Sequence, residues 1–170
     1  MAPILCFTAE EAWWTRDSGK EASVHLRTFP AVPAEWLDPG LAAKWAKVRE
    51  VRRVVTGALE VERAAKRIGS SLQAHPVVHI ERPDLREAVA AVDFADVVIT
   101  SGITLSDAPA PAAAFRLPEV AGVAVVAELA AGDKCERCWK VLPEVGAADA
   151  APETCVRCAD AVQHLGAAAQ

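Results

Sequence analysis

Four cysteines near the C-terminal end of the 170-residue chain constrain its fold more than any other feature. They form two pairs, Cys135 with Cys138 and Cys155 with Cys158, and two residues separate the members of each pair. Sixteen residues lie between Cys138 and Cys155, a spacing typical of zinc sites. Two thiolates at this spacing can bind one ion from a tight turn, and two such turns complete a tetrahedron. The pattern predicts one structural Zn²⁺ in a module over residues 133–170, with a redox pair as the alternative.

The predicted metal is structural, because a site with four cysteine ligands leaves no position open for water and is not built for hydrolysis. Residues 133–170 contain few large apolar side chains. Metal binding should therefore replace the missing core, contributing on the order of 10 kcal/mol to folding. Trp139 and Ala159 follow the second cysteine of each pair, where glycine is common in such turns.

Cations and an aromatic ring surround the cysteines. This combination suits single-stranded nucleic acid, because a ring can stack on a base while cations contact phosphate. The alternative role for the tryptophan is packing onto the zinc module. The candidate RNA-binding residues are Lys134, Arg137, Trp139, Lys140 and Arg157.

Composition limits the classes of partner. The formal net charge is −5, so bulk charge does not attract nucleic acid and any such contact must be local. The N-terminal residues lack a basic, signal-like region, and no apolar run reaches the ~18 residues that span a membrane. We therefore expect a cytoplasmic protein, where a reducing environment favours metal binding over disulfides. Cys6 lies in an apolar run and is expected to be buried.

The first part of the chain reads as two helices joined by extended segments. Residues 4–17 predict a helix, residues 22–30 a short strand, and residues 31–40 a connector marked by Pro and Gly. Over residues 41–68, apolar side chains recur at steps of three and four, which predicts a long helix. That segment carries eight cations against three carboxylates. The cations form either a solvated helix face or a stripe that contacts an anionic polymer.

The middle of the chain mixes short helices and strands, which predicts a small α+β domain over roughly residues 41–130. The expected elements are a strand at 76–80, a helix at 82–92, a strand with a glycine-marked bend at 96–105, a loop at 107–115 and a strand at 122–129.

The segments "FTAEEAW", "IGSSLQA", "KCERCWK" and "CVRC", in this order, resemble the C-terminal end of bacterial isoleucine–tRNA ligases. The resemblance runs from about Pro3 to Val162. It implies an α+β chain in three parts. Residues 1–40 would be the remnant of the helical anticodon-binding bundle, residues 41–132 a linking α/β domain with the long helix, and residues 133–170 a zinc domain that meets the anticodon region of tRNA.

The resemblance also implies the function. The four paired cysteines would be the zinc ligands, and Arg137 and Trp139 lie where anticodon contacts are expected. The partners would be isoleucine tRNA and the catalytic portion of the ligase, whose reaction attaches isoleucine to tRNA with ATP. The "HIGH" and "KMSKS" signatures of that portion do not occur in these 170 residues, so the chain resembles a fragment and is expected to be non-catalytic by itself.

Two other functions remain open from the residues alone. One is a self-standing nucleic-acid-binding zinc protein, because the zinc finger of formamidopyrimidine-DNA glycosylases has similar cysteine spacing. The other is a zinc-stapled interaction module without nucleic acid, which the acidic net charge favours.

Overall fold

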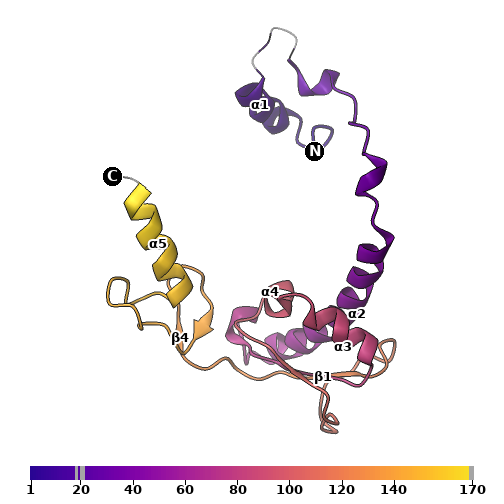
Figure 1. The fold of residues 1–170 in the computed structure, drawn as a ribbon, viewed down its shortest axis with the longest axis vertical. Helices are drawn as coiled ribbons and strands as arrows, with labels where there is room; N and C mark the ends of the chain where they lie inside the picture. The colour runs from indigo at the N-terminus through magenta and orange to yellow at the C-terminus, as the bar shows by residue number, and fades with distance from the viewer. Residues whose placement is uncertain (18, 20–21, 169–170) are drawn as a thin grey trace. The chain divides into compact units, whose positions relative to one another are not determined.

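A computed structural model of the chain describes residues 1–17, 19 and 22–168, with side chains to residue 165. The chain forms two compact units, Met1–Asp38 and Pro39–Gln170. Figure 1 traces the chain through its helices, short strands and the C-terminal helix. The mixture of helix and sheet confirms the predicted α+β class. Within the described residues, no helix is both long and apolar enough to cross a membrane.

The first unit is built around one helix, α1, which spans Cys6–Arg16 and confirms the helix predicted over 4–17. The carboxylate of Glu10 joins this helix to the segment that follows by accepting hydrogen bonds from Ser23 Oγ at 3.2 Å and Val24 N at 2.8 Å. None of the residues of α1 is buried. Cys6 is therefore exposed, and the prediction that it is buried was wrong.

The segment at 22–30 is not the predicted strand. Val24–Leu26 form a 3₁₀ turn, η1, and the hydroxyl of Ser23 accepts a hydrogen bond from His25 N at its start. A second 3₁₀ turn, η2, spans Ala34–Trp36 within the expected connector. A segment this short does not specify a strand by itself, and none of the described residues of this unit forms a strand that could pair with it.

The second unit begins with a long helix, α2, over Pro39–Ala64. Its inner face is apolar at helical spacing, as the sequence predicts, and these side chains pack into the main core. The helix ends four residues earlier than expected, because Lys66 adopts a left-handed backbone with φ of 58°. The buried residues of α2 are Val48, Val51, Val54, Val55, Ala58 and Leu59.

Helix α2 packs against a three-stranded sheet in the order β2-β1-β3. The strands are β1 (Val77–Ile80), β2 (Thr104–Ser106) and β3 (Val123–Val126). β1 is parallel to β2 and antiparallel to β3, and Val78 lies opposite both Leu105 and Val125. Helix α3, over Pro83–Ala90, follows β1 and packs on α2 with Leu85 and Val89 in the core. The strands and helix predicted from the sequence near these positions are confirmed.

The segment predicted as a bent strand at 96–105 is wrong in its first half. Phe94–Val98 form a short helix, α4, whose start is capped by the Asp93 carboxylate accepting from Asp96 N at 3.2 Å. Ile99 then closes the helix in a left-handed conformation with φ of 59°. Burial of Phe94 and Val98 in the core outweighs the strand preference of the Val-Val-Ile run.

The C-terminal part contains a two-stranded hairpin and a helix. Strands β4 (Asp133–Lys134) and β5 (Val141–Leu142) pair antiparallel, and helix α5 spans Val156–Ala168. Gly132 enters the hairpin with φ of +107°, and a Cβ there would lie 2.3 Å from a backbone carbon of β5. Only glycine tolerates this close approach without a shift of the backbone.

Candidate zinc centre

The hairpin and the helix each place one pair of cysteines at a turn. Cys135 and Cys138 bracket the turn between β4 and β5, which is closed by hydrogen bonds from Trp139 N to Cys135 O (2.8 Å) and from Cys135 N to Lys140 O (2.9 Å). Cys155 stands directly before α5, and Cys158 lies in its first turn. Both pairs are therefore fixed by local backbone hydrogen bonds.

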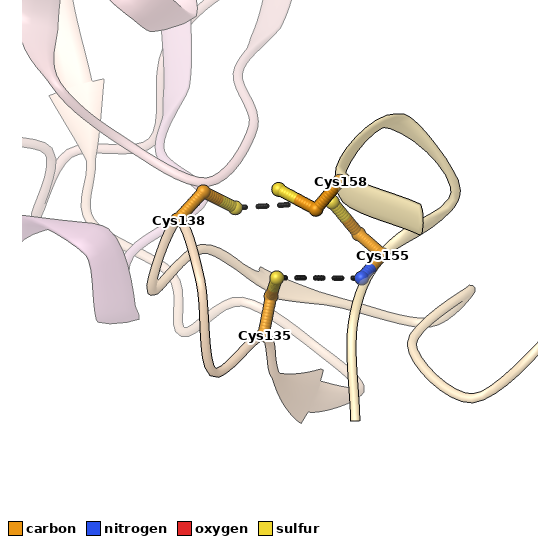
Figure 2. Close-up of side chains that lie close together, drawn as sticks. All are labelled: Cys135, Cys138, Cys155 and Cys158. Atoms are coloured by element: carbon orange, nitrogen blue, oxygen red, sulfur yellow. Dashed lines mark hydrogen bonds between the residues drawn. The ribbon is translucent and has the colours of Figure 1, made fainter. Parts of the chain in front are cut away.

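The four sulfur atoms converge on one point, and all lie within 4.8 Å of one another. Figure 2 shows the hairpin pair facing the helix pair. The Sγ atoms of Cys138 and Cys155 are 3.8 Å apart. Tetrahedral Zn–S bonds of about 2.3 Å separate neighbouring sulfurs by roughly 3.8 Å, so the cluster has the dimensions of a zinc site. Three of the cysteines are buried, and Cys138 is half-buried.

The environment of the sulfurs supports a bound cation. Burial raises the pKa of the Cys155 thiol to about 12. Burial also acts against ionisation of Cys135, but backbone hydrogen bonds outweigh it and lower the pKa of that thiol to about 6. A divalent metal holds all four as thiolates at once, which neighbouring buried thiols do not reach by themselves.

The two arginines reach across the cluster. Arg137, from the hairpin turn, donates from Nη1 to the sulfur of Cys158 at 3.7 Å. Arg157, from the helix turn, has its pKa raised by a hydrogen bond with the sulfur of Cys138. Each arginine thus contacts a sulfur of the opposite pair, an arrangement that sequence spacing does not reveal.

Trp139 projects from the turn beside the cluster. The residue is 61% exposed, and its backbone is left-handed with φ of 66°. The ammonium of Lys134 lies 5.5 Å from the centre of the indole ring, a cation–π distance. The two side chains line a groove of about 340 Å³. The other lining residues are Gly69, Ser70, Leu72, Gln73 and Val141.

Lys140, the next residue, turns away from solvent. Its side chain is only 19% exposed, and Nζ lies 2.5 Å from Oδ1 of Asp96 in α4. The hydrogen bond from Lys140 lowers the pKa of the Asp96 carboxyl. Of the five candidate RNA-binding residues, the structure thus brings Lys134 and Trp139 together at the groove. It gives Arg137, Lys140 and Arg157 partners inside the protein.

Sequence reasoning missed Asp96 and Ser101, which contact the turn from the α/β part of the unit. Both lie in the segment misread as a strand, and no pattern in the sequence links them to cysteines some 40 residues away. It also gave no role to residues 69–73 at the groove, although "IGSSLQA" was among the segments that carried the resemblance.

Most cations of the basic segment at 41–68 have partners within the protein. Arg63 and Arg67 pair with Glu60 and Glu62. Three more cations bind Asp84 or main-chain carbonyl oxygens of the α3 and α4 region. These contacts do not favour a stripe that is free to contact an anionic polymer, because most of the cations already bind carboxylates or carbonyl oxygens of this chain. The three cations that bind this region are Lys44, Lys47 and Arg52.

Two family models match the chain. The model described as the anticodon-binding domain of tRNA ligase matches residues 1–78. The model described as the zinc finger found in FPG and IleRS matches residues 132–161, which include all four clustered cysteines. Together with the sulfur geometry, these matches define a tRNA-ligase anticodon-binding segment followed by a zinc finger that holds one structural Zn²⁺.

Similar proteins narrow the class. The chain is 54% identical over 167 residues to an isoleucine–tRNA ligase of Brucella abortus, and 53% identical over 167 residues to one of Agrobacterium fabrum. It is 54% identical over 146 residues to one of Ruegeria pomeroyi. These alignments cover 98%, 98% and 86% of this chain, but only 17%, 17% and 15% of the relatives. The chain belongs with the C-terminal part of bacterial isoleucine–tRNA ligases, so the predicted resemblance is confirmed.

Proposed function

We propose that the chain acts in the cytoplasm as the part of an isoleucine–tRNA ligase that holds isoleucine tRNA on its anticodon side. In this proposal, residues 1–40 complete the anticodon-binding helical domain, residues 41–132 form the linking domain, and residues 133–170 form the zinc domain. The catalytic portion of the ligase, which attaches isoleucine with ATP, is the protein partner. The ligands of the zinc ion are Cys135, Cys138, Cys155 and Cys158.

The observation that carries the RNA proposal is the presentation of Trp139. A left-handed backbone is unfavourable for a bulky residue, and glycine would adopt it without cost. The indole is nevertheless held there with most of its surface in solvent. Burial alone does not account for such a residue, so we infer that the side chain serves a ligand. A flat ring beside a cation and a groove is suited to stacking on an unpaired base.

The metal fixes the turn that presents this ring and performs no reaction. When bound, Zn²⁺ supplies a saturated four-thiolate centre that stabilises the module. Cys138 precedes Trp139 directly, so holding the thiolate also holds the start of the tryptophan's backbone. Lys134 completes the surface by placing a positive charge over the ring, within reach of a phosphate next to a stacked base.

Binding of isoleucine tRNA by variants of the full chain tests the proposal. Trp139→Ala should weaken binding by about 5- to 150-fold, the range expected for loss of one stacked base, and leave the salt dependence unchanged. Lys134→Ala should weaken binding less and reduce the salt slope by about one unit. Trp139→Phe should recover part of the affinity, because it restores a flat ring.

Leu129→Ala is the matched control, since Leu129 is also an exposed large apolar residue, at 65%, and lies in the proposed linking domain outside the groove that Trp139 lines. Zinc content is measured for every variant. If Trp139→Ala keeps its zinc and binds tRNA like the parent chain, the tryptophan serves only the module. The alternative function, a zinc-stapled interaction module that does not bind nucleic acid, is then the better explanation.

A further inference from the structure

We propose that Asp96 and Ser101 are positioning residues for RNA binding, which lock the metal-held turn onto the α/β part and thereby aim Trp139. This inference rests on the proposed function. The two residues that follow Trp139 are both held from outside the zinc module. Lys140 is held by the carboxylate of Asp96 at 2.5 Å, and Val141 N donates to Ser101 Oγ at 2.6 Å.

Ser101 links three segments through one buried hydroxyl. The residue is 6% exposed, and its hydroxyl donates to Leu72 O while accepting from Val141 N. Its backbone N–H also donates to Ala74 O at 3.2 Å. A hydroxyl has one proton to donate and lone pairs to accept, so both contacts are satisfied at once. Because Leu72 and Val141 both line the groove beside Trp139, this hydroxyl joins two of the segments that form the groove.

Asp96 faces cations from both cysteine turns. Its ion pair with Lys140 engages the hairpin turn. Its carboxylate also interacts electrostatically with Arg157, which lies in the helix turn between Cys155 and Cys158. Asp96 itself is fixed at the start of α4, where its backbone N–H donates to the Asp93 carboxylate. Through its ion pair with Lys140, this carboxylate ties the hairpin half of the zinc module to the α/β part.

These contacts hold the backbone that follows Trp139, whereas the metal holds the cysteine that precedes it. Trp139 is preceded by a cysteine of the cluster and followed by two anchored residues, so its left-handed backbone is restrained at both ends. The strands of the module are only two residues long, so the hairpin alone offers little rigidity. A ring held in its binding orientation loses less freedom when a base stacks on it, and this raises affinity.

Because Asp96 is negatively charged, positioning and simple electrostatics predict opposite changes in RNA affinity when the charge is removed. Asp96→Asn removes a negative charge near the proposed RNA surface and replaces the ion pair with Lys140 by at most a weaker, uncharged hydrogen bond. Through-space attraction alone therefore predicts tighter RNA binding for this variant. Positioning predicts weaker binding. Ser101→Ala removes both hydroxyl contacts without changing any charge, so positioning predicts that it weakens RNA binding in the same way.

The experiment measures tRNA affinity for Asp96→Asn and Ser101→Ala in the full chain, each with Trp139 intact and with Trp139→Ala. With Trp139 intact, each variant should bind roughly three- to tenfold more weakly, the effect of one or two lost hydrogen bonds. In the Trp139→Ala background, neither should weaken binding further, because the residues act through the ring. Asp96→Glu and Ser101→Thr should recover affinity, since they restore the carboxylate and the hydroxyl.

Matched controls come from the same domain. Asp107→Asn removes an exposed carboxylate paired with Arg86, and Ser106→Ala removes a hydroxyl that accepts from Ala108 N. Both should bind tRNA like the parent chain. Tighter or unchanged binding by Asp96→Asn overturns the positioning role. An equal loss with and without Trp139 also overturns it.

A measurement without RNA separates this inference from the proposed function. The chain is labelled with fluorotryptophan, and the ¹⁹F resonance of Trp139 is assigned by its loss in Trp139→Phe. Asp96→Asn and Ser101→Ala should shift or broaden this resonance, whereas the two controls should not. If the resonance is unmoved, positioning fails even where RNA binding stands. If Trp139→Ala leaves tRNA binding intact, the proposed function fails, and the inference that rests on it fails as well. A resonance that is altered in that case shows that the contacts of Asp96 and Ser101 only order the turn.

Discussion

The left-handed backbone of Trp139 makes a quantitative prediction about zinc affinity. Trp139→Ala and Trp139→Gly both remove the indole and differ only in the backbone preference of the new residue. With φ of 66°, alanine carries a left-handed penalty of about 1–2 kcal/mol that glycine avoids. Glycine loses about 0.4–1 kcal/mol more conformational entropy on folding, which offsets part of that advantage. The glycine variant should therefore be more stable than the alanine variant by about 0.5–1 kcal/mol.

Because folding of the module is coupled to metal binding, this difference should appear in the zinc dissociation constant. Competition with a chromophoric chelator should show that Trp139→Gly binds zinc roughly two- to fivefold more tightly than Trp139→Ala. Glu136 supplies the matched control, since it lies in the same turn with an ordinary negative φ. There the alanine variant should bind zinc more tightly than the glycine variant. Equal or tighter zinc binding by Trp139→Ala would refute the strained turn.

Four further substitutions test the fold and the metal centre. Elemental analysis should find about one zinc per chain for Cys6→Ala and substantially less for Cys135→Ala, because only the latter removes a proposed ligand. Gly132→Ala should weaken zinc binding by more than tenfold, since its φ is +107° and a Cβ would meet the backbone of β5. Gly57→Ala should lower the free energy of unfolding in urea by about 1–3 kcal/mol, because its Cβ would lie 2.8 Å from the Phe115 ring; a stability like that of the parent chain would contradict this packing.

The parts of this structure that were predictable from sequence are those whose signal is local. Two residues between cysteines specify a turn, and two turns specify the cluster. The period of apolar residues likewise specified α2, whose buried face lies where the spacing of Val48, Val51 and Val55 places it. These features depend on neighbours within a few residues, so one sequence suffices to find them.

The parts that were not predictable depend on distant partners. Val97, Val98 and Ile99 favour a strand, but burial of α4 against the core makes Val97 and Val98 helical, and Ile99 ends the helix in a left-handed conformation. Lys140 reads as a free cation until folding brings Asp96 to it across 44 residues. Sequence spacing therefore located the cluster of four cysteines, whereas tertiary contacts decide which cations face solvent.

The interaction of each arginine with the opposite pair of cysteines changes the net charge that the zinc module presents to a polyanion. Four thiolates around a divalent ion carry a net charge of −2, which would repel RNA. Arg137 and Arg157 place two guanidinium groups against those sulfurs, so the centre as a whole is close to neutral. A centre that is close to neutral does not oppose the positive charge that Lys134 places over the ring of Trp139 at the groove. An acidic chain can in this way present one patch that an approaching nucleic acid does not avoid.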